Sequence, residues 1–441
     1  MNRRGFLQLG AKTGLSAAFM PLWMRLAGMQ AYAQSTGGYK AIVCITLSGG
    51  NDGNNMIVPL DNATYQQYAS LRQGLAIGQS SLLPVECASS NTMLGFHPSM
   101  PNLASIFSRG YGSVIGNCGP MDQPLTKAVL TSDTSLLPEL FGSHPAAIAQ
   151  WESATTQAYP ETGWGGRIAD QVTSSSGLLP PVITVTGVST FTVGASVQSI
   201  SMLEAAFGSQ PTPASLAAPA AEIANLDAQS SNELVQRAAQ MRISANNLQG
   251  ILQQSQQMGA GIQTAFPTST LGQNLLTIAQ LIRGRAATEA SRQLFYCNTG
   301  NYDTHGSQLT THATLLSDLD SSLGAFVTAL QEIGMLQNVL IVTVSDFGRT
   351  MQSNSSLGSD HGWGNHQLIL GGGLPGQRLI GSLPDFDLGG SQDYTGQGVW
   401  IPSIATQQVA GGIASWFGLS SAQIASIFPN LATFSQNPIT L

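Results

Sequence analysis

The sequence predicts an α/β fold in which helices sandwich a doubly wound, mostly parallel sheet. Short apolar runs alternate along the chain with helical patterns, which is typical of βα units. Most of these runs are nearly continuous in apolar residues, as expected for strands covered on both faces. The length of 441 residues allows one large α/β domain or two smaller ones, with an ample core.

The predicted strands are the apolar runs themselves. They cover Ala41–Leu47, Ser113–Asn117, Val182–Val185, Gln293–Cys297, Val339–Val344 and Gln367–Leu370. The clearest helix is expected from about Gln308 to Leu336, where apolar residues recur every three or four positions and form one buried stripe. That stripe consists of Leu316, Leu319, Leu323, Phe326, Leu330 and Ile333.

Residues 188–290 have a different composition, rich in Ser, Ala and Gln, with a long polar-faced helical stretch near Asn232–Met258. Two interpretations stay open: a helical layer of the same domain, or a helical insertion that partly covers the site. The stretch Ile401–Phe434 indicates helices that close the fold.

The N-terminus predicts an export signal. Arg3-Arg4 precede Gly5-Phe6-Leu7 and a moderately apolar stretch, and Ala31-Tyr32-Ala33 supplies a small-x-small cleavage site. We therefore expect a twin-arginine signal peptide at residues 1–33, a single α/β domain at 34–441, and a periplasmic or secreted location reached through the twin-arginine export machinery. The alternative is an amphipathic first helix of the fold.

The charge balance excludes nucleic acid as a partner. The predicted signal contains four of the 16 basic residues and no acidic ones, so the mature chain keeps 12 basic against 23 acidic residues, a net charge of −11. No run of Lys or Arg is present to follow a phosphate backbone.

The four cysteines show no metal-binding spacing. Cys87 and Cys118 lie near predicted loops and are candidates for a disulfide in an oxidising compartment, whereas Cys44 and Cys297 lie inside apolar runs and are expected in the core.

Polar segments follow several of the predicted strands. Functional side chains gather at the carboxyl ends of strands in parallel α/β sheets, and His and carboxylates are the ligands of divalent metals. The sequence therefore predicts a metal site for one or two ions (Zn, Mn, Mg or Ca). Its candidate ligands are Asp52, Asp303, His305, Asp346, His361 and His366.

Each of these candidates has an ordinary structural alternative. Asp52 lies in Gly-Gly-Asn-Asp-Gly, which is ordinary turn chemistry, and His305 is also placed to cap the long helix. Asp346 ends an apolar strand and needs a partner, either a metal or Arg349. One of His361 and His366 is expected to be a ligand, and the sequence does not decide which.

Other polar residues are candidates for catalysis. Ser143 begins a helix that ends near Trp151-Glu152, so its hydroxyl is a candidate nucleophile at a helix N-terminus, with a plain N-cap as the alternative. Arg167 and Arg349 are candidates for stabilising negative charge on a substrate. His97 is expected to cap a helix, and His312 is expected at the surface.

Together these segments resemble an exported bacterial family called domain of unknown function 1501, within the alkaline-phosphatase-like superfamily. The motifs that carry the resemblance are Leu47-Ser48-Gly49-Gly50-Asn51-Asp52, Phe96-His97-Pro98, Ser143-His144, Gly163-Trp164-Gly165-Gly166-Arg167, Tyr302-Asp303-Thr304-His305-Gly306, Ser345-Asp346-Phe347-Gly348-Arg349-Thr350 and Asp360-His361-Gly362. The likeness covers nearly the whole mature chain.

The resemblance implies a metal-dependent hydrolase acting on a phosphate or sulfate ester, with a small anionic ester or a carbohydrate-derived substrate. By chain order, Asp52 and Asp346 resemble the ligands of one ion. Asp303, His305 and either His361 or His366 resemble the ligands of another ion. Ser143 takes the place of the nucleophile. Phe347 stands where the active enzymes carry a histidine. The alternative is therefore a non-catalytic exported protein that keeps the fold for binding or for assembly at the cell surface.

Overall fold

The computed structural model describes residues 38–88, 92–172, 177–202, 222–435 and 439. Its centre is a nine-stranded sheet with the strand order β11-β5-β10-β9-β1-β8-β6-β7, in which β12 also pairs with β5. The strands are β1 (Lys40–Leu47), β5 (Gly112–Gly119), β6 (Val182–Thr184), β7 (Ile200–Ser201), β8 (Arg292–Thr299), β9 (Val339–Ser345), β10 (Asn365–Gly371), β11 (Leu379–Ile380) and β12 (Ile404–Ala405). All strand pairs are parallel except those of β10 with β5 and β9.

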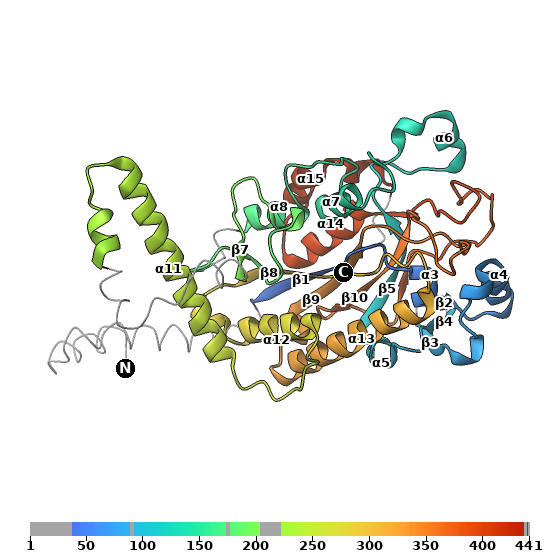
Figure 1. Cartoon of the computed structure of the whole chain (residues 1–441), viewed down its shortest axis with the longest axis horizontal. Coiled ribbons are helices and arrows are strands. Elements are labelled where there is room, and N and C mark those ends of the chain that lie inside the picture. The colour runs from blue at the N-terminus through green and yellow to red at the C-terminus, as the bar shows by residue number, and fades with distance from the viewer. Residues whose placement is uncertain (1–37, 89–91, 173–176, 203–221, 436–438, 440–441) are drawn as a thin grey trace.

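Helices cover both faces of this sheet (Figure 1). Alternate residues of β1 point to opposite faces, so Val43 and Ile45 enter one core and Ile42 and Cys44 the other. The first core is covered by α5 (Pro101–Ser108), α12 (Thr270–Arg283) and α13 (Gln308–Glu332), and the second by α7 (His144–Ser153), α8 (Trp164–Gln171), α14 (Thr406–Phe417) and α15 (Ser421–Ile427). The predicted doubly wound, mostly parallel α/β class is confirmed.

The long helix α13 buries the predicted stripe, from Leu316 to Leu330. It ends at Glu332, four residues before the predicted end at Leu336. The chain then turns at Gly334, whose φ of +67° favours glycine, and a short 3-10 helix, Leu336–Asn338, leads into β9.

A smaller antiparallel sheet lies beside the main one, with the order β2-β4-β3 (Figure 1). It is formed by β2 (Ile57–Pro59), β3 (Leu83–Cys87) and β4 (Thr92–Phe96). The short helix α3 (Gly53–Met56) connects β1 to this sheet, and α4 (Asn62–Arg72) follows β2. The remaining short helix, α6, spans Lys127–Ser132.

Residues 222–290 form a helical layer, whereas residues 188–202 contain a short 3-10 helix, Thr190–Thr192, and strand β7. Helix α12 packs on α13 and β8, and α11 (Glu233–Gly259) packs on α12. Figure 1 shows α11 at the end of the sheet opposite α3, which follows the carboxyl end of β1. Over residues 222–290, therefore, the helices extend the sandwich and do not cover that carboxyl edge.

The predicted export signal lies outside the described residues. Among the residues that the structure describes, no helix has the length and apolar character needed to cross a membrane.

All four cysteines are free and buried. The suggested disulfide between Cys87 and Cys118 is absent because the two side chains belong to cores on opposite faces of the main sheet.

Candidate metal centre

The carboxyl ends of three adjacent strands define the site. Leu47 at the end of β1 pairs with Thr299 of β8 and with Ser345 of β9, so the three strands end at one level. The loops that follow bring Gly49, Asp303 and Asp346 to this edge, and the Gly49 N–H donates to Asp346 Oδ1 at 3.0 Å. The predicted convergence of distant polar segments is therefore present.

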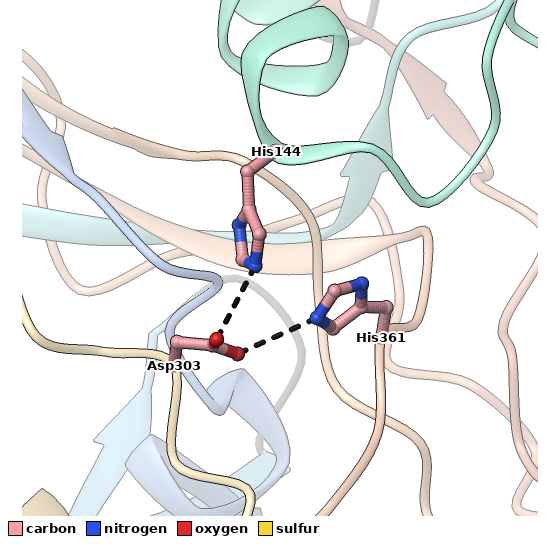
Figure 2. Close-up of side chains that lie close together, drawn as sticks. All are labelled: His144, Asp303 and His361. Carbon is pink, nitrogen blue, oxygen red and sulfur yellow. Dashed lines mark ion pairs between the residues drawn. The ribbon is translucent and has the colours of Figure 1, made fainter.

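Three side chains lie close enough to share one metal ion: His144, Asp303 and His361. One ligand atom of each lies within 4.8 Å of the other two. In Figure 2 the two imidazole rings point toward the carboxylate of Asp303, and each Nε2 atom is 3.4 Å from one of its oxygens. His144 comes from the first residue of α7, and the other two come from loops that follow β8 and β9.

His305 extends this cluster. Its Nε2 atom is 2.9 Å from Asp303 Oδ1 and 3.0 Å from Nε2 of His361. The side chain is 44% exposed, so His305 closes the solvent side of the cluster. Three imidazole Nε2 atoms therefore surround one carboxylate.

The contacts at Nδ1 of each histidine determine which ring nitrogen faces the carboxylate of Asp303. His361 Nδ1 contacts the carbonyl oxygen of Gly142 at 2.8 Å, and a carbonyl can only accept, so the proton is on Nδ1. His144 Nδ1 lies 2.7 Å from Asp346 Oδ2, and His305 Nδ1 lies 3.1 Å from Asp360 Oδ1. Each ring thus has an anionic or carbonyl acceptor at Nδ1 and directs Nε2 toward Asp303.

This arrangement fits a divalent metal. When both rings are neutral and donate Nδ1–H outward, the Nε2 lone pairs of His305 and His361 face each other at 3.0 Å beside a carboxylate oxygen. Such a set of lone pairs is stable around a cation, and imidazole ligands whose second nitrogen donates to a carboxylate or carbonyl are the usual form of protein metal sites. The donor set of imidazole and carboxylate suits Zn or Mn better than Ca.

Nearby charges keep Asp303 ionised. Burial alone would raise the pKa of its carboxyl, but nearby positive charge, first of all the Arg349 guanidinium that donates to it, holds this pKa below its usual value. Arg349 Nη1 donates to Asp303 Oδ1 at 3.0 Å, and the rest of the Arg349 side chain is fully buried. Arg349 thus holds Asp303 in place and has no exposed nitrogen for a substrate.

Asp346 lies behind His144 and not in the cluster itself. Its side chain is 1% exposed, and burial raises the pKa of its carboxyl, although the hydrogen bonds from His144 and Gly49 oppose this shift. Its two oxygens are occupied by those two donors. The geometry is that of a carboxylate that orients a histidine.

Phe347 occupies the position at which the resemblance implies a histidine. Its ring forms an apolar wall of the cluster. Its ring centroid lies 4.9 Å from that of His144 and 4.4 Å from that of His361. The histidine beside Asp346 is supplied instead by α7. Ser143 at the start of this helix was predicted as a candidate functional residue, whereas the adjacent His144 was not.

Besides Asp346, two further predicted ligands, Asp52 and His366, lie outside the cluster. Asp52 is fully buried and pairs with the Arg72 guanidinium, and the Gln308 amide also donates to it. His366 is buried on β10, where its Nδ1 accepts from the backbone N–H of Asn117 at 3.0 Å.

The other candidate residues also have definite places. Ser143 is the half-buried N-cap residue of α7, but its side chain makes no cap hydrogen bond. Arg167 donates to the carbonyl oxygens of Thr162 and Ser153, which ties down the loop before α8.

The prediction that His312 lies at the surface is wrong. It is 1% exposed and its Nε2 contacts Asn51 Oδ1 at 2.9 Å, because the loop after β1 covers the first turns of α13. His97 packs edge-on against His312, and its Nδ1 accepts from the N–H of Ser99, just before α5.

Several solved structures are similar to this chain at low sequence identity. The PsFucS1 sulfatase from Pseudoalteromonas sp. is 11% identical, with a TM-score of 0.35, and the match covers 90% of this chain and 71% of that one. The lipoteichoic acid synthase LtaP from Listeria monocytogenes is 8% identical, with a TM-score of 0.37 and coverage of 91% and 76%. The comparison with curated proteins finds no match.

The sequence also matches a family model that is described as "Protein of unknown function (DUF1501)". The match runs over residues 39–394 and includes the smaller sheet, every strand of the main sheet except β12, and every residue of the candidate metal centre. The chain therefore belongs to this family, as its motifs predicted.

Proposed function

We propose that this protein is an exported hydrolase of phosphate or sulfate esters that depends on a single divalent metal ion. The observation that carries the proposal is the convergence of three imidazole Nε2 atoms on the carboxylate of Asp303, each ring held by an acceptor at Nδ1. His144, Asp303 and His361 would hold the ion, and His305 would complete the set from the solvent side.

A divalent ion in this position supplies a Lewis acid that polarises an ester oxygen. Around it, Asp346 and Asp360 fix the orientation of His144 and His305 through their Nδ1 atoms. Phe347 packs on two of the rings and excludes water from that side. Arg349 keeps Asp303 ionised and in position.

Ser143 is the candidate nucleophile of this proposal. It immediately precedes His144, and its hydroxyl is not used to cap α7. The positive end of the α7 dipole would favour a developing negative charge on that oxygen.

We propose one ion and not two because Asp52 already has a cationic partner. Arg72 is fully buried, and its guanidinium also donates to Asn55 Oδ1 at 3.0 Å and to the Thr350 carbonyl at 2.9 Å. A second ion at Asp52 would have to displace this network or share its carboxylate with a buried positive charge.

Metal content and hydrolysis test the proposal together. Purified mature protein, exposed to Zn and Mn and then desalted, is expected to retain about one ion per chain and to hydrolyse p-nitrophenyl phosphate or p-nitrophenyl sulfate. Asp303→Ala and His361→Ala should lose both properties. His366→Asn is the matched control, because His366 lies in the same segment as His361 but outside the cluster. Only trace metal in the wild-type protein refutes the proposal, and bound metal without hydrolysis favours the non-catalytic alternative.

A further inference from the structure

A cavity beside the metal centre extends the site toward a second part of the substrate. We propose that this cavity binds the alcohol part of the ester, and that it selects an alcohol with hydroxyl or amino groups and without a second anionic group. The inference rests on the proposed function for its role in catalysis, but the binding that it predicts is measured separately.

The cavity shares two elements with the metal centre. Helix α7 begins with His144, and its residues Pro145, Ile148, Ala149 and Glu152 line the cavity from one face of the helix, at positions i, i+3, i+4 and i+7. Ser48, another lining residue, is adjacent to Gly49, which donates to Asp346. Because the cavity and the metal centre share these elements, we place the alcohol part of an ester held at Asp303 in this cavity.

The size and walls of the cavity suit a small organic group. Its volume is about 490 Å³, within the range of small-molecule sites. Pro145, Ile148, Pro160, Val188 and Val193 supply apolar surface for the carbon skeleton, and Ser48, Ser189, Thr190, Tyr296 and Asn298 are polar residues beside it.

The preference for an alcohol without a second anionic group follows from the charge of the residues that line the cavity. This lining contains two carboxylates, Glu152 and Glu161, and no Lys, Arg or His. Glu152 is 1% exposed and accepts hydrogen bonds from Tyr296 Oη at 2.6 Å, Thr46 Oγ1 at 3.2 Å and the Phe191 N–H at 3.2 Å, none of which is cationic. Burial raises the pKa of Glu152, although its hydrogen bonds oppose this shift, so the exposed carboxylate of Glu161 is the main source of repulsion. A second anion would be repelled by Glu161 and would find no cationic partner in the lining, whereas hydroxyl or ammonium donors would be attracted.

The first test measures binding without catalysis. Methyl glucoside, methyl glucosaminide and methyl glucuronide share one ring and differ in charge, and their binding to chelator-treated protein is followed by ligand-observed NMR. We expect the glucoside and the glucosaminide to bind, and the glucuronide to bind at least about tenfold more weakly. Equal binding of the three, or binding of the glucuronide alone, overturns the inference.

One variant at the cavity and one control elsewhere sharpen this test. Glu161 is exposed, so Glu161→Lys is expected to fold and to raise the relative affinity for the glucuronide by about tenfold. Glu86→Lys, an exposed charge reversal on β3, is the matched control and should leave the preference unchanged. If Glu161→Lys leaves the preference unchanged, the cavity does not determine it and the inference fails.

Hydrolysis of the corresponding sugar 1-phosphates separates the two proposals. Cleavage of glucose 1-phosphate and glucosamine 1-phosphate in preference to glucuronic acid 1-phosphate supports both. Charge-selective binding in a protein that hydrolyses no ester supports the cavity and overturns the proposed function. Hydrolysis of p-nitrophenyl esters with no binding of any of the three glycosides overturns the cavity alone.

Discussion

Replacing Asp346 by asparagine tests whether this buried carboxylate sets the metal affinity through His144. The Gly49 N–H is a fixed backbone donor to Asp346 Oδ1, so the asparagine oxygen is expected to stay with Gly49. Its amide nitrogen then faces His144 Nδ1, where Asp346 Oδ2 lies 2.7 Å away in the wild-type protein. An N–H donor at this position favours the tautomer with the proton on Nε2, the atom that faces Asp303.

The magnitude follows from the role of such orienting carboxylates. Their loss typically lowers metal affinity by about 10- to 100-fold, which corresponds to about 1.4–2.7 kcal/mol. Folding should not suffer in proportion, because the variant replaces a buried carboxylate by a neutral group of the same shape. We expect the metal-free variant to unfold within a few degrees of the metal-free wild-type protein.

Competition with a chromophoric chelator measures the affinity for Zn and Mn. Asp320→Asn is the matched control, because Asp320 is also a buried carboxylate but accepts from the N–H groups of Asn102 and Leu103 at the start of α5. The control should bind metal like the wild-type protein. A wild-type affinity for Asp346→Asn would refute the assignment of His144 as a ligand oriented by Asp346.

Three further predictions concern stability and export. Burial lowers the pKa of His366 to about 4, against about 6.5 in the unfolded chain. The stability that the neutral ring contributes is therefore complete above pH 6.5, and up to about 3 kcal/mol of it is lost as the pH falls toward 4. His366→Asn keeps an acceptor at this position and should reduce the pH dependence of urea unfolding in that range, to which His97 and His312 still contribute because burial also lowers their pKa values. An unchanged profile would contradict this. Arg72→Leu leaves Asp52 buried without its cation and should lower the free energy of unfolding in urea by about 3–5 kcal/mol, with a smaller loss for Arg72→Lys. A loss below about 1 kcal/mol would show that the pair is not ionic. Replacing Arg3 and Arg4 by lysine should keep the protein in the cytoplasm, and an unchanged periplasmic fraction would disprove twin-arginine export.

The strands and the long helix could be predicted because their signals are local. The run that became β1 is apolar throughout, since helices cover both sides of it, and α13 shows its buried stripe directly in the spacing of leucines. An apolar run does not show whether its strand is parallel or antiparallel to its neighbours. The antiparallel pairing of β10 was therefore not predictable from its residues. His312 precedes Leu316 by four positions and thus lies on the same stripe, so its burial was predictable from the periodicity.

The partners within the site depend on contacts that no local pattern shows. His144 and Asp346 are separated by 202 positions, and nothing around Phe347 indicates that a histidine from α7 stands beside the carboxylate. Asp52 looked like a metal ligand because it follows a buried strand, but Arg72, 20 residues further on, reaches back to it from the end of α4. Long-range tertiary packing therefore decides which acidic residues face the candidate metal centre.

The buried thiols described above have a consequence for where the chain can mature. Burial raises the pKa of Cys87 to about 11 and that of Cys297 to about 12, and it also raises the pKa values of Cys44 and Cys118, so little reactive thiolate forms at neutral pH. A native state that needs no oxidation step can be completed in reducing cytosol, so a chain exported as proposed would have its candidate ligand set assembled before translocation. Selection of the metal would then reflect the ions available inside the cell and not those of the compartment in which the protein works.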